Sequence, residues 1–358
     1  MNKPHNFSAG PCILSESVLQ QASEAVINFD GLNLSLIEVS HRSKNFEAVM
    51  ERSQQLVKEL LGVPEGYQVL FLQGGASLGF LISAYNMMGN RKNPAYINTG
   101  TWSAGAIKEV SFTGATANVI ASSQDRNFCY IPKDYVIPTD SDYLHITTNN
   151  TIEGTQFHHI PETHVPLVAD MSSDIFSKQI DVSKFDLIYA GAQKNLGPAG
   201  ATLYIVKEEA MARRTLAIPT MLDLKKQYEK DSMYNTPPVF SIYVSMLTLE
   251  WLKDLGGIGE MERINNEKAA CLYAEIDRNS LFKGTADLED RSKMNVTFVL
   301  NNADLEPEFD RLWKEAQISG IRGHRSVGGY RASLYNALPL SSVQALVEVM
   351  QNLEKQFG

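Results

Sequence analysis

The chain has 358 residues, of which 44% are hydrophobic and 20% are charged, as in a soluble globular protein with a large core. The formal net charge is −9, from 32 basic and 41 acidic residues. This balance argues against a general nucleic-acid-binding protein, which needs a basic face, and leaves room for a local pocket that binds a small anion.

The chain contains three cysteines and no C-x-x-C spacing. An odd number of scattered cysteines matches neither a disulfide framework nor a zinc site, so we expect no metal and a reducing, cytoplasmic location. The amino terminus lacks the apolar segment of a secretory signal. Residues 66–90 carry no charge but contain many polar residues and glycines, so a buried strand, a turn and a buried helix explain them better than a membrane span.

Strand-like and helix-like runs alternate along the first two thirds of the chain. Residues 43–62 show an apolar helical face, and the closing Gly62 suits a C-terminal cap. The pattern predicts an α/β fold with a mostly parallel sheet covered by helices on both faces. A short turn separates the last two strands, so that pair should be antiparallel. The seven predicted strands are residues 69–72, 95–98, 118–121, 143–147, 166–170, 186–190 and 202–206.

After Val239 the pattern changes to longer helices separated by single strands. This succession indicates a smaller α+β domain that begins near Gly256. The predicted elements are helices over 241–257 and 260–277, a strand over 295–300, a helix over 307–320, a strand over 330–335 and a final helix with an apolar stripe.

Polar residues follow several of the predicted strands, and open α/β sheets bind ligands beyond the carboxyl ends of their strands. The amides of Ala76 and Ser77 would open a helix after a glycine turn and offer an anion site, although a plain strand-to-helix turn is the alternative. Trp102 follows the strand over 95–98, where its ring either covers a flat ligand or packs in the usual way. Thr151 lies in the turn after the strand over 143–147.

Asp170 and Lys194 each follow one of two successive predicted strands. Taken alone, Asp170 suits a turn cap, and Lys194 suits a turn residue that points to water. Neighbouring strands would instead bring both side chains to the same edge of the sheet. A buried lysine with a lowered pKa is a candidate Schiff-base nucleophile, and enzymes that use pyridoxal 5'-phosphate (PLP) pair this lysine with an acid at the pyridine nitrogen.

These residues resemble those of the phosphoserine aminotransferases, a class-V, fold-type-I family of PLP-dependent enzymes. The resemblance implies a large PLP-binding domain with a seven-stranded sheet over residues 16–255, and a small domain formed by residues 1–15 and 256–358. The matching segments cover essentially the whole chain in order: "NFSAGP" (6–11), "HRSK" (41–44), "QGGAS" (73–77), "TGTWS" (99–103), "NNTIEGT" (149–155), "VADMSSDI" (168–175), "GAQKNLGPAG" (191–200), "YNTPPVFSIY" (234–243) and "GHRSVGGYRASLYNA" (323–337).

The resemblance also implies an activity. Members of the family transfer the amino group of glutamate to 3-phosphohydroxypyruvate in a ping-pong reaction, which gives phosphoserine and 2-oxoglutarate in serine biosynthesis. They also act on phosphohydroxythreonine in vitamin B6 (pyridoxine) biosynthesis. One site must therefore accept two substrates, each with an α-carboxylate and a distal anion.

Residue roles follow from the resemblance as well. Lys194 would form the Schiff base and move protons, with Asp170 at the pyridine nitrogen. Arg331 would bind the α-carboxylate, since arginine binds carboxylates through two parallel hydrogen bonds. The other implied contacts are Trp102 on the cofactor ring; Thr151 near its hydroxyl; Ala76, Ser77 and Gln193 on its phosphate; Asn235 and Thr236 on the phosphate of the second subunit of a homodimer; and His41, Arg42, His324 and Arg325 on the distal anion.

Three other functions remain as alternatives. A cysteine desulfurase would need a reactive cysteine near the substrate arginine, and the segment 320–331 has none. An alanine–glyoxylate type of transaminase has no need for two His-Arg pairs. A non-catalytic protein that binds phosphorylated ligands would have no use for Lys194 beside Asp170.

Overall fold

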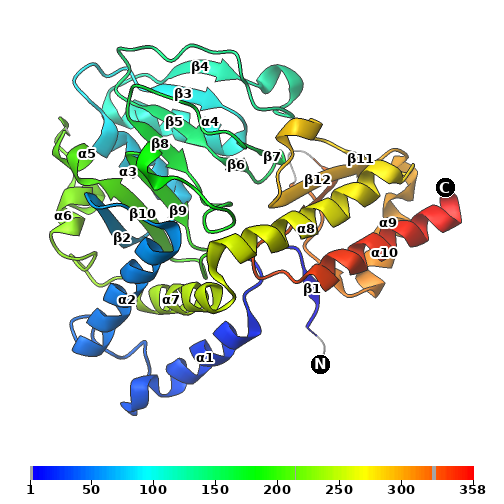
Figure 1. Cartoon of the computed structure of the whole chain (residues 1–358), viewed down its shortest axis with the longest axis horizontal. Coiled ribbons are helices and arrows are strands. Elements are labelled where there is room, and N and C mark those ends of the chain that lie inside the picture. The colour runs from blue at the N-terminus through cyan, green and yellow to red at the C-terminus, as the bar shows by residue number, and fades with distance from the viewer. Residues whose placement is uncertain (1–2, 214, 325–327) are drawn as a thin grey trace.

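The computed structural model describes residues 3–213, 215–324 and 328–358, and its larger region is built on a seven-stranded sheet (Figure 1). The strand order is β2-β10-β9-β8-β5-β3-β4. Strand β10 is antiparallel to both of its neighbours, and all other pairs are parallel. The predicted mostly parallel sheet and its antiparallel last pair are confirmed. The strands are β2 (Tyr67–Gln73), β3 (Ala95–Asn98), β4 (Asn118–Ser122), β5 (Leu144–Thr147), β8 (Leu167–Asp170), β9 (Leu187–Gly191) and β10 (Ala201–Lys207).

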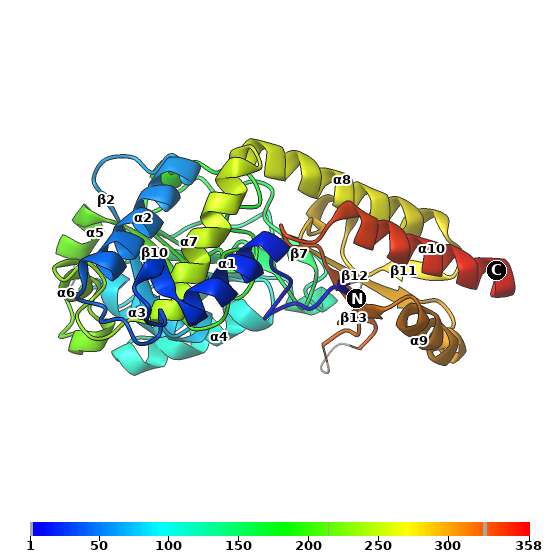
Figure 2. The ribbon, with the colours of Figure 1, turned by 90° about the horizontal axis from the view of Figure 1, so that it is seen from below.

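Helices cover both faces of this sheet, because successive side chains of a strand point to opposite faces. Ile188 and Ala190 of β9 join a core with helices α2 (Lys44–Leu61) and α7 (Val239–Asp254). Leu187 and Tyr189 of the same strand face the other way. They join a core with α3 (Ala76–Met87) and α4 (Thr101–Glu109). Figure 2 shows the two helix pairs on opposite sides of the sheet.

The second region is built on a three-stranded antiparallel sheet, β11 (Phe282–Gly284), β12 (Asn295–Leu300) and β14 (Tyr330–Ser333). The long helices α8 (Gly257–Arg278) and α10 (Leu340–Phe357) pack on it (Figures 1 and 2). Its core also contains Phe7 and Ile13, so the amino-terminal segment packs with the carboxy-terminal third of the chain. Domain boundaries at residues 15 and 256 stay a prediction.

One predicted element is wrong in length. Helix α9 (Glu306–Glu315) ends five residues before the predicted end of the helix at Gly320. Gln317 has a left-handed backbone with φ of 57°, which stops the helix. The next two residues form strand β13 (Ile318–Ser319), which pairs in parallel with β1 (His5–Asn6). This pairing connects segments more than 300 residues apart, so no local pattern predicts it.

The remaining described elements are short or peripheral, and none of the described helices has the length and hydropathy needed to cross a membrane. They are α1 (Glu16–Ile27), α5 (Glu208–Ala212), α6 (Leu224–Tyr228), the strands β6 (Asn149–Asn150) and β7 (Thr155–Gln156), and the 3₁₀ turns Phe29–Gly31, Val110–Thr113, Gln124–Arg126, Val182–Lys184, Thr220–Leu222, Leu288–Asp290 and Ala303–Leu305.

Candidate active site

Two neighbouring parallel strands, β8 and β9, bring Asp170 and Lys194 to the same edge of the sheet. Asp170 is the last residue of β8, and its backbone pairs with Tyr189 of β9. Strand β9 ends at Gly191, and Lys194 follows three residues later. Both side chains therefore lie beyond the carboxyl ends of parallel strands, where open α/β sheets bind their ligands.

The Asp170 carboxylate is buried, with 4% of the residue exposed. Its Oδ1 accepts hydrogen bonds from the backbone N–H of Ser172 at 2.9 Å and from the Ser172 hydroxyl at 2.6 Å. Burial raises the pKa of Asp170, while the Lys194 charge and the Ser172 hydrogen bonds act in the opposite direction. The aspartate thus caps the next turn, and it also places a carboxylate beside the lysine.

The amine of Lys194 points into the site. Its Nζ donates a hydrogen bond to Thr151 Oγ1 at 3.0 Å and lies 5.9 Å from the centroid of the Trp102 ring. Burial lowers the pKa of Lys194, and the Asp170 charge partly opposes this effect. The alternative of a turn lysine that points to water is therefore wrong.

The proposed phosphate contacts lie at the start of helix α3. Ala76 and Ser77 are its first two residues, so their N–H groups lie in the first turn, where helices lack internal acceptors. A Cβ atom on Gly191 would lie 3.0 Å from Gln193 Oε1 and 3.4 Å from the Ala76 nitrogen. Glycine at position 191 thus lets the Gln193 side chain and the start of α3 come close together.

Arg331 reaches the site from strand β14 of the smaller region. Its Nη1 donates a hydrogen bond to the Thr151 carbonyl at 3.3 Å, and burial lowers its pKa. Among the described residues, the buried nitrogens without a hydrogen-bond partner include Arg331 Nε and Trp102 Nε1, and also His41 Nε2, His145 Nδ1 and Arg291 Nε. Buried donors without partners are costly, so the Arg331 and Trp102 groups fit a ligand that brings anionic oxygens.

Four other residues predicted for the site make no recorded contact with Lys194 or its neighbours in the described part of the chain. Among the described residues, no hydrogen bond, ion pair or ring contact connects His41, Arg42, Asn235 or Thr236 to Lys194 or its neighbours. The Asn235 side chain donates only to the Thr236 carbonyl, at 3.3 Å. His324 lies seven residues before Arg331 and is exposed, and Arg325 lies outside the described residues.

The amino-terminal segment packs against the lysine turn, which the sequence did not reveal. A Cβ on Gly10 would lie 3.5 Å from Lys194 Cγ, and the Tyr335 hydroxyl donates to the Ala9 carbonyl at 3.0 Å. Cys12 Sγ donates to the Lys194 carbonyl at 2.7 Å. Burial raises the pKa of the Cys12 thiol to about 12, which disfavours a thiolate nucleophile and argues against a cysteine desulfurase.

The residues present fit PLP. A lysine with a lowered pKa suits the aldehyde, and a buried carboxylate suits a protonated ring nitrogen. An indole ring 5.9 Å from the amine suits a flat ring, and a glycine-bounded helix start suits a phosphate. These four features converge on one edge of the sheet.

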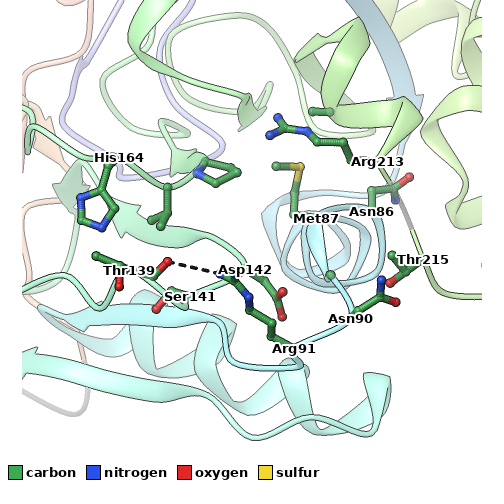
Figure 3. A pocket seen from close by; sticks show the side chains of 14 residues that line it. Asn86, Met87, Asn90, Arg91, Thr139, Ser141, Asp142, His164, Arg213 and Thr215 are labelled. Carbon is green, nitrogen blue, oxygen red and sulfur yellow. Dashed lines mark hydrogen bonds between the residues drawn. The ribbon is translucent and has the colours of Figure 1, made fainter.

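A separate cavity of about 430 Å³ lies near the amino ends of two strands of the sheet, β5 and β8 (Figure 3). Asp142 and Pro166 line it; Asp142 lies two residues before β5, and Pro166 directly precedes β8. Arg91 crosses the cavity and donates from Nη1 to the Thr139 carbonyl at 3.2 Å (Figure 3). None of the described residues assigned to the PLP site lines this cavity.

Comparison with known proteins identifies the family. The family model for class-V aminotransferases matches residues 5–346. The chain is 60% identical over 355 residues to phosphoserine aminotransferase of Flavobacterium psychrophilum, with 99% of each chain covered. Two solved structures are similar over nearly all of both chains. Phosphoserine aminotransferase from Bacillus circulans subsp. alkalophilus is 41% identical with a TM-score of 0.96 and 99% of each chain covered. The PLP-bound enzyme from Trichomonas vaginalis is 35% identical with a TM-score of 0.93, covering 98% of this chain and all of that one.

These matches confirm the predicted family and fold. The chain belongs to the class-V aminotransferases, a PLP-dependent family of fold type I, and within that family to the phosphoserine aminotransferases.

Proposed function

We propose that this enzyme transfers the amino group of glutamate to 3-phosphohydroxypyruvate and so forms phosphoserine and 2-oxoglutarate in serine biosynthesis. The observation that carries this proposal is the Lys194 amine, which has a lowered pKa and lies 3.0 Å from Thr151 beside the buried Asp170. The 60% identity to a phosphoserine aminotransferase over 99% of both chains supports the choice of substrates.

Lys194 is the proposed nucleophile and proton carrier. PLP, when bound, supplies an electron sink for the bonds at the substrate α-carbon. A lowered pKa gives Lys194 a larger neutral fraction at neutral pH, and only the neutral amine attacks an aldehyde. Lys194 Nζ would also take the substrate α-proton as general base and return a proton as general acid.

Asp170 and Thr151 set the electrostatic environment of this amine. A carboxylate beside the ring nitrogen keeps that nitrogen protonated, because an opposite charge favours the charged form. The Thr151 hydroxyl accepts from Lys194 Nζ and thereby orients the amine. The Thr151 carbonyl accepts from Arg331, so one residue aligns the nucleophile with the proposed carboxylate-binding arginine.

The proposed substrate contacts match two anions. Arg331 would bind the α-carboxylate, and its unpartnered Nε leaves a donor for the ligand. Arg42 and Arg325, with His41 and His324, would bind the distal phosphate or carboxylate. Phosphohydroxythreonine carries the same two anionic groups, which supports it as a second substrate in vitamin B6 synthesis.

We further propose a cytoplasmic homodimer in which Asn235 and Thr236 bind the cofactor phosphate of the neighbouring subunit. The absence of contacts between these residues and Lys194, within the residues described for one chain, agrees with a role across the interface. The three cysteines are free thiols, which agrees with a reducing compartment.

The test is a comparison of amino acceptors with the purified protein. With glutamate as donor, 3-phosphohydroxypyruvate should be converted at least about 100-fold more efficiently than pyruvate or glyoxylate, because only the former fills the distal anion site. Lys194→Ala should abolish turnover and the covalent attachment of PLP, measured by mass spectrometry after borohydride reduction. Equal efficiency with all three acceptors would contradict the proposal.

A further inference from the structure

The carboxylate of Glu153 caps the helix that carries Trp102. Its Oε1 accepts hydrogen bonds from the Thr101 backbone N–H at 2.7 Å and from the Thr101 hydroxyl at 2.8 Å. Thr101 and Trp102 are the first two residues of α4, and the preceding residue, Gly100, has no side chain that could cap the helix. A residue from a distant turn therefore accepts from the first N–H of this helix, while the Ser103 hydroxyl accepts from the Gly100 N–H.

The backbone makes room for this contact. A Cβ on Gly100 would lie between 2.5 and 2.8 Å from three atoms of the Glu153 carboxylate. Gly100 also has a backbone φ of 157°, a conformation that residues other than glycine rarely adopt. Position 100 thus accepts only glycine if the carboxylate is to reach Thr101.

Glu153 also belongs to the turn that contains Thr151. The Gly154 N–H donates to the Asn150 carbonyl at 2.9 Å and closes this turn. Thr151 Oγ1 accepts from Lys194, and its carbonyl accepts from Arg331.

Glu153 is 8% exposed, and its second oxygen, Oε2, has no hydrogen-bond partner among the described residues. Leaving half of a buried carboxylate without a donor costs stability, so fold stability alone does not account for a charged residue here. An uncharged acceptor such as glutamine would serve the Thr101 contact. Stability of the fold therefore does not explain the carboxylate, and the helix start that it caps carries Trp102.

We propose that Glu153 is a positioning residue of the active site, which fixes Trp102 through the start of α4. This inference rests on the proposed function, because it takes Trp102 to cover the cofactor ring. Glu153 acts through Thr101 and makes no hydrogen bond to the Trp102 side chain in the described residues.

Two substitutions separate the cap from the charge. Glu153→Ala removes both the cap and the charge, whereas Glu153→Gln keeps an oxygen for Thr101 and removes only the charge. Asp181→Ala is a matched control, because the Asp181 carboxylate also accepts from one backbone N–H and one hydroxyl, both of Ser183, at the start of a surface 3₁₀ turn.

The first measurement is Trp102 fluorescence in the cofactor-free protein, taken as the difference between each variant and the same variant with Trp102→Phe. Glu153→Ala should shift this difference spectrum to the red and weaken PLP binding by about 5-fold, as expected for the loss of a helix cap. Glu153→Gln and Asp181→Ala should leave both unchanged. The Trp102 spectrum can be measured without enzyme turnover, so it tests this inference alone. A failure of the proposed reaction would instead appear as inactivity of the unmodified enzyme.

The second measurement is steady-state kinetics of the holoenzyme. Glu153→Gln should keep kcat and KM for glutamate close to those of the unmodified enzyme, because its amide oxygen can still accept from Thr101. An unchanged Trp102 spectrum in Glu153→Ala, or equal changes in Glu153→Ala and Asp181→Ala, would each overturn the proposal. If Glu153→Ala does not fold, Thr101→Val removes only the hydroxyl contact, and an unshifted Trp102 spectrum in that variant would also overturn it.

Discussion

The amine of Lys194 lies 3.0 Å from the hydroxyl of Thr151, and this hydrogen bond joins the two halves of the proposed active site. Lys194 follows strand β9 of the large sheet. The Thr151 carbonyl accepts a hydrogen bond from Arg331, which belongs to the smaller sheet. Chemistry at Lys194 and carboxylate binding at Arg331 are therefore aligned through a single threonine.

Asp170→Asn should lower the pKa of Lys194 further, because the Asp170 charge favours the protonated amine. We expect kcat to fall by about 10²- to 10³-fold, the usual effect of removing one preorganised electrostatic contact. The pKa shift is measured in the cofactor-free protein as the pH dependence of Lys194 acylation, read by mass spectrometry. Ser172→Ala keeps the carboxylate and should have a much smaller effect on both quantities. An acylation midpoint that does not move in Asp170→Asn would contradict the assigned coupling.

Arg331→Lys should raise KM for glutamate by about 100-fold, because lysine cannot bind a carboxylate through two parallel hydrogen bonds. Arg322→Lys is the control, since Arg322 forms an isolated bridge with Tyr330, the neighbour of Arg331, and pairs with Glu306 and Asp310. Steady-state kinetics with both variants measures the difference. Similar KM values for the two variants would remove Arg331 from the substrate site.

A mixture of two inactive variants should regain activity if Asn235 acts across a dimer interface. Lys194→Ala and Asn235→Ala subunits would form mixed dimers in which one site has both an intact lysine and an intact asparagine. Random mixing gives mixed dimers in about half of the molecules, so about a quarter of the activity of the unmodified enzyme should return. If Asn235 serves the site of its own chain, mixing after mild unfolding and refolding would restore nothing.

Lys268 should make stability depend on pH above neutrality. Its side chain is fully buried, its Nζ donates to the Leu334 and Tyr335 carbonyls at 2.9 Å each, and burial lowers its pKa from 10.5 to about 7. Between these two values the unfolded chain binds more protons than the folded chain, so the free energy of unfolding rises with pH. This gain amounts to at most about 4 kcal/mol between pH 7 and pH 10.

Lys268→Met should lack this rise. Urea denaturation of the cofactor-free protein at several pH values measures it, and Lys253→Met is the control because Lys253 is exposed and pairs with Glu59. Parallel curves for the unmodified protein and Lys268→Met would show that Lys268 keeps an ordinary pKa.

Local patterns in the sequence predicted the strands of the large sheet and predicted that the residues after two neighbouring strands lie close together. Strands β8 and β9 are short apolar runs, so their ends, and with them Asp170 and Lys194, were evident before the structure. The roles of His41, Arg42, Asn235 and Thr236 came from family resemblance and stay predictions. The continuation of α9 beyond Glu315 was wrong, because Ile318 of β13 continues the apolar helical pattern while its backbone pairs with β1.

The sequence by itself determined the family, the mostly parallel sheet and the candidate residues for its chemistry, because motif residues and apolar periods are written along the chain. Only the tertiary structure decided which groups meet. It placed Cys12 on the carbonyl of Lys194, Glu153 on the start of α4, and Arg331 on the carbonyl of Thr151. Each of these contacts joins segments more than 50 residues apart, and their distances and burial set the pKa of each group, which no local pattern encodes.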